Sequence, residues 1–128
     1  FEPDLNQDRF LSDNICFSGV RLAKRCRAKA IVPMTFSGYT AFKISSFRPA
    51  AGIYVFTGNE RLLNILSLLW GTRGFYYDEF QSTDQTIEDI KKVLKQKGYV
   101  EEDDVIVNMT SMPINEKGMT NMVRVSYV

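Results

Sequence analysis

The sequence predicts an α/β fold in which a mostly parallel five-stranded sheet forms the middle of three layers, α/β/α. Short apolar segments typical of buried strands alternate along the chain with longer segments of helical periodicity. Parallel strands joined by helices require right-handed crossovers, which cover both faces of the sheet. The last two apolar segments are joined by a loop without a helix, which allows the final strand to return antiparallel at an edge.

The first long segment of helical periodicity covers residues 9–27, and residues 9–128 are assigned to one domain. Residues 1–8 have little apolar pattern and predict a linker or arm from a preceding domain; the chain begins with Phe1 rather than Met, so we expect a piece of a longer protein. The helix carries two apolar stripes, one of Leu11, Ile15, Gly19, Leu22, Ala23 and Cys26, the other of Phe10, Phe17 and Val20. The second stripe either faces a partner or packs within the same fold.

A strand, turn, helix and strand unit follows over residues 28–57. Residues 30–34 and 52–56 are apolar and predict the two strands, with an Arg48-Pro49 break before the second. The turn that opens the helix, called here the Thr35 turn, is Thr35-Phe36-Ser37-Gly38-Tyr39-Thr40. Free backbone amides and the positive end of a helix dipole favour an anion such as phosphate there, although ordinary N-cap and turn chemistry also explains these residues.

The second half of the chain repeats this alternation. Residues 59–70 have a broad apolar face and predict a helix that stops at Gly71, followed by a short strand at residues 74–77. Ser82 and Gln85 have the spacing of a capping box at the start of a helix that Gly98 ends. Residues 105–109 predict the fourth strand, and residues 122–128 alternate as a half-exposed fifth.

A second wall for a ligand pocket is predicted in the loop before the last strand. In open α/β sheets, ligands bind beyond the carboxyl ends of the strands. The Thr35 turn and the loop at residues 110–120 both leave the sheet at that end. The polar candidates in this loop are Asn115, Lys117, Gly118 and Thr120.

Composition excludes several classes of function. Sixteen basic and fifteen acidic residues give a net charge of +1, so no bulk electrostatic field favours nucleic acid or an anionic membrane, and we expect neither as a partner. The chain has no histidine, which removes His-based catalysis and the commonest zinc ligand. Cys16 and Cys26 form no ligand pattern and predict buried thiols of a reduced, cytoplasmic protein. No apolar segment reaches the roughly 18 residues that span a bilayer, and we expect no metal site.

The motifs, taken together, resemble a known family. Their order is Ala28-Lys29-Ala30-Ile31-Val32, Ser37-Gly38-Tyr39-Thr40-Ala41, Phe47-Arg48-Pro49 and Thr120-Asn121-Met122-Val123-Arg124-Val125. In this order the chain resembles the C-terminal domain of pyruvate kinases over about residues 11–128. The resemblance implies a mixed sheet whose last strand is antiparallel, in the allosteric and subunit-contact domain of a homotetrameric, cytoplasmic enzyme of glycolysis. That phosphotransferase interconverts phosphoenolpyruvate plus ADP and pyruvate plus ATP.

The resemblance also implies what this chain lacks. The catalytic residues and the magnesium and potassium ions of the family belong to a separate barrel domain, so we expect no catalytic residue and no cofactor here. The partners implied are the barrel domain, other subunits and a phosphorylated small-molecule effector. In activator-responsive relatives, a Thr-x-Ser-Gly-x-Thr loop holds one phosphate of a sugar phosphate, which carries over to Thr35, Ser37, Gly38 and Thr40.

The residues around this loop depart from the bisphosphate pattern of the family. Phe36 stands where some relatives have Lys, and Thr86 lies roughly where they have Arg. Residues 75–89 are acidic and would repel a second phosphate. We therefore expect a monophosphate, such as a pentose or hexose monophosphate or AMP, with Lys117 as the remaining cation. Phe36 and Tyr39 either stack on this ligand or pack within the fold. The alternatives are a structural domain with a vestigial effector site and a free-standing module that binds phosphorylated metabolites.

Overall fold

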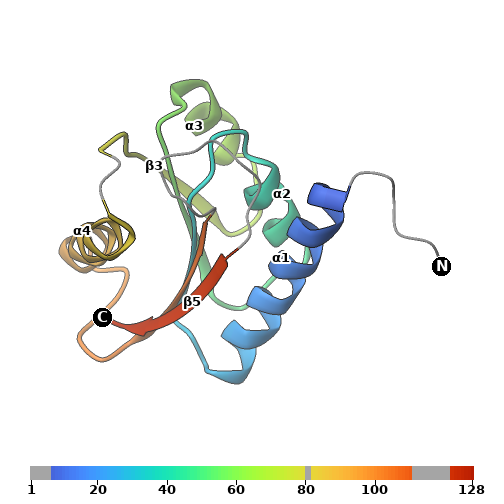
Figure 1. Cartoon of the computed structure of the whole chain (residues 1–128). Coiled ribbons are helices and arrows are strands. Elements are labelled where there is room, and N and C mark those ends of the chain that lie inside the picture. The colour runs from blue at the N-terminus through green and yellow to red at the C-terminus, as the bar shows by residue number, and fades with distance from the viewer. Residues whose placement is uncertain (1–6, 80–81, 111–121) are drawn as a thin grey trace.

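The computed structural model describes residues 7–79, 82–110 and 122–128 of the chain. Helices and strands alternate through most of these residues, as the sequence predicts (Figure 1). Their order is α1 (Gln7–Arg25), β1 (Ala30–Pro33), α2 (Tyr39–Ser46), β2 (Gly52–Thr57), α3 (Glu60–Leu66), β3 (Thr72–Tyr76), α4 (Thr83–Gln96), β4 (Val105–Thr110) and β5 (Met122–Tyr127).

The strands form one mixed sheet in the order β3-β2-β1-β4-β5. The pairs β1–β2, β1–β4 and β2–β3 are parallel, whereas β5 runs antiparallel to β4 at the edge. The predicted fold class, with an antiparallel last strand, is therefore confirmed. Parallel pairing brings the ends of β1 and β4 to the same edge of the sheet, since Pro33 is the register partner of Met109.

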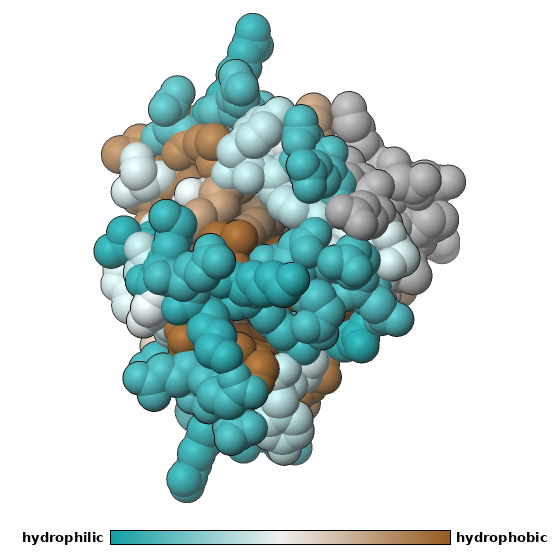
Figure 2. Space-filling model, turned by 90° about the vertical axis from the view of Figure 1, so that its left-hand side faces the viewer, coloured by the Kyte–Doolittle hydropathy of each residue, from teal (hydrophilic) through white to brown (hydrophobic). Residues whose placement is uncertain are grey.

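The sheet separates two apolar cores, because successive side chains of a strand point to opposite faces. Helices α1, α2 and α3 cover one face, and α4 covers the other (Figure 1). The strand residues that face α1, α2 and α3 are Ile31, Ile53, Val55, Val107 and Met109. Those that face α4 are Ala30, Val32, Phe56 and Ile106. The outer surface on the α4 side is mainly hydrophilic, with hydrophobic residues visible in the gaps (Figure 2).

Helix α1 contacts the sheet through small residues, which corrects the predicted stripes. The buried residues are Ser12, Cys16, Gly19 and Ala23, whereas Leu11 is 58% and Phe17 46% exposed. A Cβ atom added at Gly19 would lie 2.7 Å from the Met109 Cε, so the helix approaches the sheet too closely for a larger residue. The prediction that both thiols are buried is wrong for Cys26, which follows the end of α1 and is exposed.

The second predicted stripe of α1 contacts the chain's own core. The ring of Phe17 meets that of Phe47 edge-on at a centroid distance of 5.6 Å, and Val20 packs against the core cluster. The Arg21 guanidinium lies 5.6 Å from the centroid of the Phe17 ring. These contacts support the second of the two interpretations, a stripe that packs within the same fold.

The predicted start and end of α4 are confirmed. The Ser82 side chain accepts a hydrogen bond from the Gln85 amide, and Gly98 has a φ of 79°. Helix α1 begins at Gln7, slightly before the predicted residue 9. No helix in the described part of the chain combines the length and the apolar character that crossing a membrane requires.

Candidate functional site

The Thr35 turn lies directly beyond the carboxyl end of β1. The Met34 amide donates to the Met109 carbonyl at 2.8 Å, and the Thr35 amide donates to the Phe56 carbonyl at 3.2 Å. The chain is therefore held between its two neighbouring strands until Thr35. The turn that follows is fixed at the end of the sheet where open α/β folds bind ligands.

Gly38 fixes the shape of the turn. It has a φ of 90°, in the left-handed region, and a Cβ atom there would lie 2.5 Å from the Leu62 Cδ1. Its carbonyl accepts the hydrogen bond from the Phe42 amide, 3.0 Å long, that begins α2. Only glycine meets both the backbone and the steric requirement, because it has no Cβ.

Two hydroxyl oxygens of the turn lie at the N-terminus of α2. The Thr35 Oγ1 accepts from the Gly38 amide at 3.1 Å, and the Ser37 Oγ accepts from the Tyr39 amide at 3.4 Å. The first turn of α2 contains no acidic residue. The hydroxyl oxygens thus stand where the oxygens of a bound anion would meet these amides.

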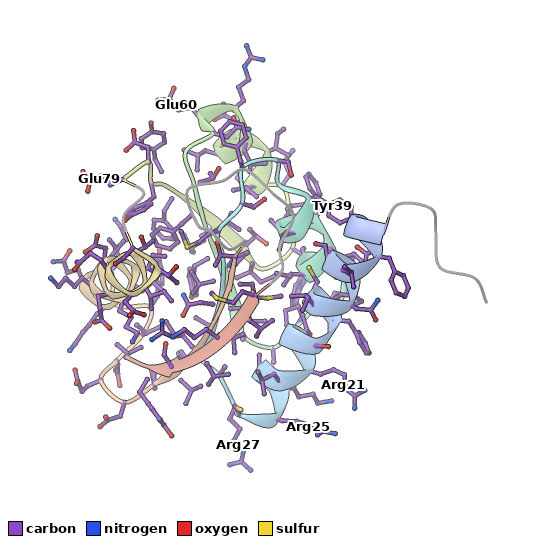
Figure 3. All side chains as sticks on the ribbon, viewed as in Figure 1. Arg21, Arg25, Arg27, Tyr39, Glu60 and Glu79 are labelled. Atoms are coloured by element: carbon purple, nitrogen blue, oxygen red, sulfur yellow. The ribbon has the colours of Figure 1, made fainter. Side chains whose placement is uncertain are left out.

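The aromatic residues of the turn have different surroundings. The Tyr39 side chain points toward α1 (Figure 3), where its hydroxyl donates to the Asp13 Oδ1 at 2.5 Å. Asp13 also lies 3.9 Å from the Lys43 Nζ. Tyr39 therefore joins α2 to α1, which supports the packing interpretation for this residue. Phe36 is 43% exposed.

The turn also contacts the start of α3. The Phe36 carbonyl accepts from the Asn59 Nδ2 at 2.8 Å, while the Asn59 Oδ1 accepts from the Arg61 amide at 3.2 Å. Thr40 is buried, at 3% exposure. Neither Asp13 nor Asn59 is among the residues that the sequence predicts for the site. The sequence indicates Asn59 as the N-cap of a helix, whereas no sequence pattern indicates the contact of Asp13 with the turn.

The predicted second wall, Asn115, Lys117, Gly118 and Thr120, lies outside the described residues. The register of β1 and β4 nevertheless places Thr110, the last residue of β4, at the same end of the sheet as the Thr35 turn. Of the predicted site residues, the structure brings together residues 35–40, of which Tyr39 and Thr40 are the first residues of α2.

Two carboxylates, Glu60 and Glu79, lie at this end of the molecule. Both lie at the end where α2 begins, away from Arg21, Arg25 and Arg27 at the opposite end (Figure 3). The Tyr76 hydroxyl donates to the Asp78 Oδ2 at 2.9 Å, and this hydrogen bond raises the pKa of Tyr76. The tyrosine thus stays protonated at neutral pH.

The sequence also matches a known family over most of its length. Residues 13–126 match the sequence model of the family described as pyruvate kinase, alpha/beta domain. The chain belongs to this pyruvate kinase family. The predicted resemblance to the C-terminal domain of pyruvate kinases is thereby confirmed.

Bacterial pyruvate kinases are among the similar curated proteins. That of Lactobacillus delbrueckii subsp. bulgaricus is 32% identical over 111 residues, covering 87% of this chain and 19% of the relative. The pyruvate kinase of Clostridium acetobutylicum is 32% identical over 138 residues, covering 99% of this chain and 29% of the relative. That of Clostridium perfringens is 32% identical over 127 residues, covering 99% and 27%. The chain therefore spans less than a third of each of these pyruvate kinases.

Proposed function

We propose that this chain is the effector-binding and subunit-contact domain of a pyruvate kinase, and that the Thr35 turn binds the phosphate of a monophosphorylated metabolite. The observation that carries the proposal is the position of the two hydroxyl oxygens at the amides that open α2. The left-handed Gly38 holds these amides in place, and no carboxylate occupies the first turn of the helix.

A phosphate can replace the hydrogen bonds within the turn at little cost in free energy. The hydrogen bond from the Tyr39 amide to the Ser37 Oγ, at 3.4 Å, is longer than the usual range for such bonds. A phosphate oxygen would accept a shorter, charge-assisted bond from the same amide. The displaced Ser37 and Thr35 hydroxyls would then donate to the phosphate, so the exchange adds hydrogen bonds and places negative charge at the positive end of the helix dipole.

The surrounding charges favour one phosphate over two. Glu60 and Glu79 are exposed carboxylates at this end of the sheet, and the exposed Asp78 follows the carboxyl end of β3. A second phosphate would have to approach them, and like charges repel most strongly at short range. The proposal also includes the predicted second wall of the site, in which Lys117 would supply the cation that pairs with the phosphate.

In the parent enzyme the effector would act by shifting a population of subunit arrangements. A ligand activates only if it binds the active arrangement more tightly than the inactive one. The catalytic step, between phosphoenolpyruvate and ADP in glycolysis, would belong to the barrel domain with its magnesium and potassium. The present chain supplies no catalytic residue in this proposal, so a coupled assay on the purified chain should show no turnover; robust turnover would contradict it.

Calorimetric titration with AMP, hexose monophosphates and fructose bisphosphate tests the effector site. We expect micromolar binding of a monophosphate, which corresponds to about 8 kcal/mol, and no tighter binding of the bisphosphate. Thr35→Val removes the hydroxyl with little change in shape and should weaken binding about tenfold, the value of one hydrogen bond. Thr35→Ser keeps the hydroxyl and is the matched control. Equal affinities of the two variants would contradict the proposed role of Thr35.

The edge strand β5 is the proposed contact between subunits. Val125 is 40% and Tyr127 71% exposed on this strand. An exposed alternating edge is a surface onto which another copy of the chain can pair. Val123 packs against the core cluster, so Val125→Lys is the cleaner perturbation. Sedimentation should show a lower mass for Val125→Lys than for the unmodified chain, and an unchanged mass would count against this edge.

A structural domain with a vestigial effector site is the second candidate. It is favoured by the hydroxyls of the turn, which already satisfy the Gly38 and Tyr39 amides in the absence of any ligand. The same titrations distinguish the two functions. If none of the phosphorylated ligands gives a heat of binding, the result would support the structural domain.

A further inference from the structure

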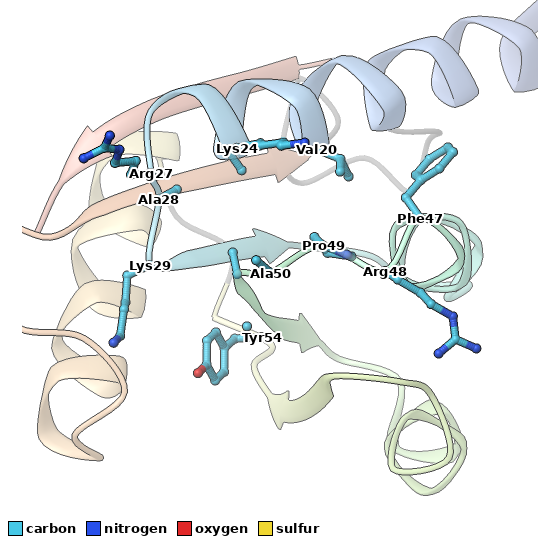
Figure 4. A pocket seen from close by; sticks show the side chains of 13 residues that line it. Val20, Lys24, Arg27, Ala28, Lys29, Phe47, Arg48, Pro49, Ala50 and Tyr54 are labelled. Carbon is cyan, nitrogen blue, oxygen red and sulfur yellow. The ribbon is translucent and has the colours of Figure 1, made fainter.

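A pocket lies at the end of the sheet opposite the Thr35 turn, where the chain enters β1 and β2 (Figure 4). The connection from α1 to β1 and the connection from α2 to β2 form its walls. Its volume is about 710 Å³, within the range of roughly 300–1,000 Å³ typical of small-molecule sites. None of the residues of the Thr35 turn lines it, so it is a separate cavity.

The charged residues that line this pocket are all basic: Lys24, Arg27, Lys29 and Arg48. In Figure 4, Lys24 lies on α1, Arg27 and Lys29 lie on the connection to β1, and Arg48 lies on the connection to β2; the charged ends of Arg27, Lys29 and Arg48 point away from one another. Within the described residues, the ion pairs join other side chains, and none involves these four. The chain as a whole carries a net charge of only +1, whereas the charged side chains of this lining are all positive. The acidic residues that precede β4 at the same end of the sheet, Glu101, Glu102, Asp103 and Asp104, are not part of the lining. A cleft lined by one sign of charge attracts ligands of the opposite sign.

Arg27 occupies a backbone position that normally belongs to glycine. It follows α1 with a φ of 54°, as Gly98 follows α4 with a φ of 79°. Both helix ends have the same pair of closing hydrogen bonds, 3.3 and 2.8 Å long after α1 and 3.1 and 3.0 Å long after α4. Glycine is the favoured residue in this motif because a side chain is strained there. The chain uses glycine at α4 and accepts the strain of an arginine at the pocket.

Arg48 repeats the same exception at the end of α2. Its φ is 48°, and its guanidinium lies 5.6 Å from the centroid of the Trp70 ring. In the described residues, the non-glycine positions with positive φ are Arg27, Arg48 and Asp103. Two of these three line the basic pocket. Strained backbone positions of this kind concentrate at ligand sites.

The floor of the pocket is apolar and includes Val20, Ala23, Phe47 and Pro49. Tyr54 lies beside it, with its ring stacked on that of Tyr99 at a centroid distance of 4.9 Å. Burial is the main cause that raises the pKa of Tyr54, so its hydroxyl remains protonated and can donate to an anion. Cations at the rim and an apolar floor together match an organic molecule that carries several negative groups.

We propose that this pocket binds a small organic polyanion, whose phosphate or carboxylate groups contact Lys24, Arg27, Lys29 and Arg48 while its carbon skeleton lies on the apolar floor. This inference goes beyond the proposed function and does not depend on it. It assigns an anion site to the end of the sheet where β1 and β2 begin, whereas the Thr35 turn lies at the opposite end, which carries Glu60 and Glu79.

The test is an amide NMR titration of the 128-residue chain with inorganic pyrophosphate and, separately, with citrate. We expect saturable shifts at residues 24–29 and 47–52, and the more strongly bound probe identifies phosphate or carboxylate as the preferred group. Arg27→Gly should weaken binding about tenfold, the value of one hydrogen bond to a charged group, and raise the melting temperature by relieving the backbone. Lys97→Gln removes an equal charge outside the pocket and should leave the affinity unchanged.

Several results would overturn the inference. Equal weakening by Lys97→Gln would show that the probes respond only to general surface charge. A lower melting temperature with unchanged binding in Arg27→Gly would show that Arg27 is structural. Shifts confined to residues 35–41 would support the proposed function and contradict a site at the basic pocket. Shifts confined to the basic pocket would support this inference and contradict phosphate binding at the Thr35 turn.

Discussion

Replacing Gly38 by alanine should destabilise the fold by about 2–4 kcal/mol, which follows from two separate effects. A residue with a Cβ costs about 1–2 kcal/mol in the left-handed region, and Gly38 has a φ of 90°. The new Cβ would also lie 2.5 Å from the Cδ1 of Leu62, which is only 3% exposed and has little room to move. Overpacking of this kind costs about 1–3 kcal/mol, while the stiffer unfolded chain returns about 0.4–1 kcal/mol.

Gly98→Ala is the matched control, because it isolates the backbone effect. Gly98 has a φ of 79°, and a Cβ there would have no atom within 4 Å. Its replacement should therefore cost about 1 kcal/mol or less once the unfolded state is considered. The difference between the two variants measures the contact with Leu62.

Urea unfolding followed by circular dichroism gives both free energies of unfolding. A third variant, Gly38→Ala with Leu62→Ala, should lose less stability than the sum of its two single variants, because the truncated side chain no longer meets the new Cβ. If Gly38→Ala costs no more than Gly98→Ala, the contact does not constrain the turn and the reasoning is refuted.

Four further predictions concern two hydrogen bonds and the two thiols. Tyr39→Phe removes the hydrogen bond between α2 and α1 and should lower the free energy of unfolding in urea by about 1–2 kcal/mol. Tyr76→Phe removes an exposed hydrogen bond and should leave the free energy of unfolding almost unchanged. Equal losses in the two variants would contradict a role for burial. Ser82→Ala removes the cap of α4 and should cost about 1 kcal/mol by the same assay. Burial raises the pKa of Cys16 from 9.0 to about 11, so the fold should lose stability as pH rises through that interval, a loss that Cys16→Ala should reduce. At pH 8 a thiol reagent should modify Cys26 at once and Cys16 only on unfolding, which mass spectrometry can follow.

The fold was predictable because local signals and hydrophobic pattern agree along most of the chain. Glycines and capping residues mark the helix ends, and the apolar segments have the length of strands. Helix α3 is one exception, because it ends at Leu66 and not at the predicted residue 70. Helix α1 is another, since the prediction followed large residues such as Leu11. The sheet instead requires small side chains at Ser12, Cys16 and Gly19, because the helix lies close to Met109. Hydrophobic pattern alone does not reveal how closely two elements approach.

The candidate site was predictable only where its residues are adjacent in sequence. Ser37 and Gly38 identify the Thr35 turn and its position after a strand. The contact of Tyr39 with Asp13 joins two helices that are distant in sequence, so no local pattern indicates it. The basic pocket is likewise assembled from two separate connections. The end of α1 is not evident from the sequence, because Arg27 occupies the position at which a glycine usually marks the end of a helix.

The position of β1 in the sheet has a consequence for folding. This strand is fully buried and lies between β2 and β4. Ala30 pairs with Gly52 nearby and with Ile106 much later in the chain. During synthesis the first three strands leave the ribosome before β4, so the edge of β1 that awaits β4 stays open and apolar until the last quarter of the chain emerges. The slow, long-range closure by β4 is thus the step at which the nascent domain is most exposed to aggregation.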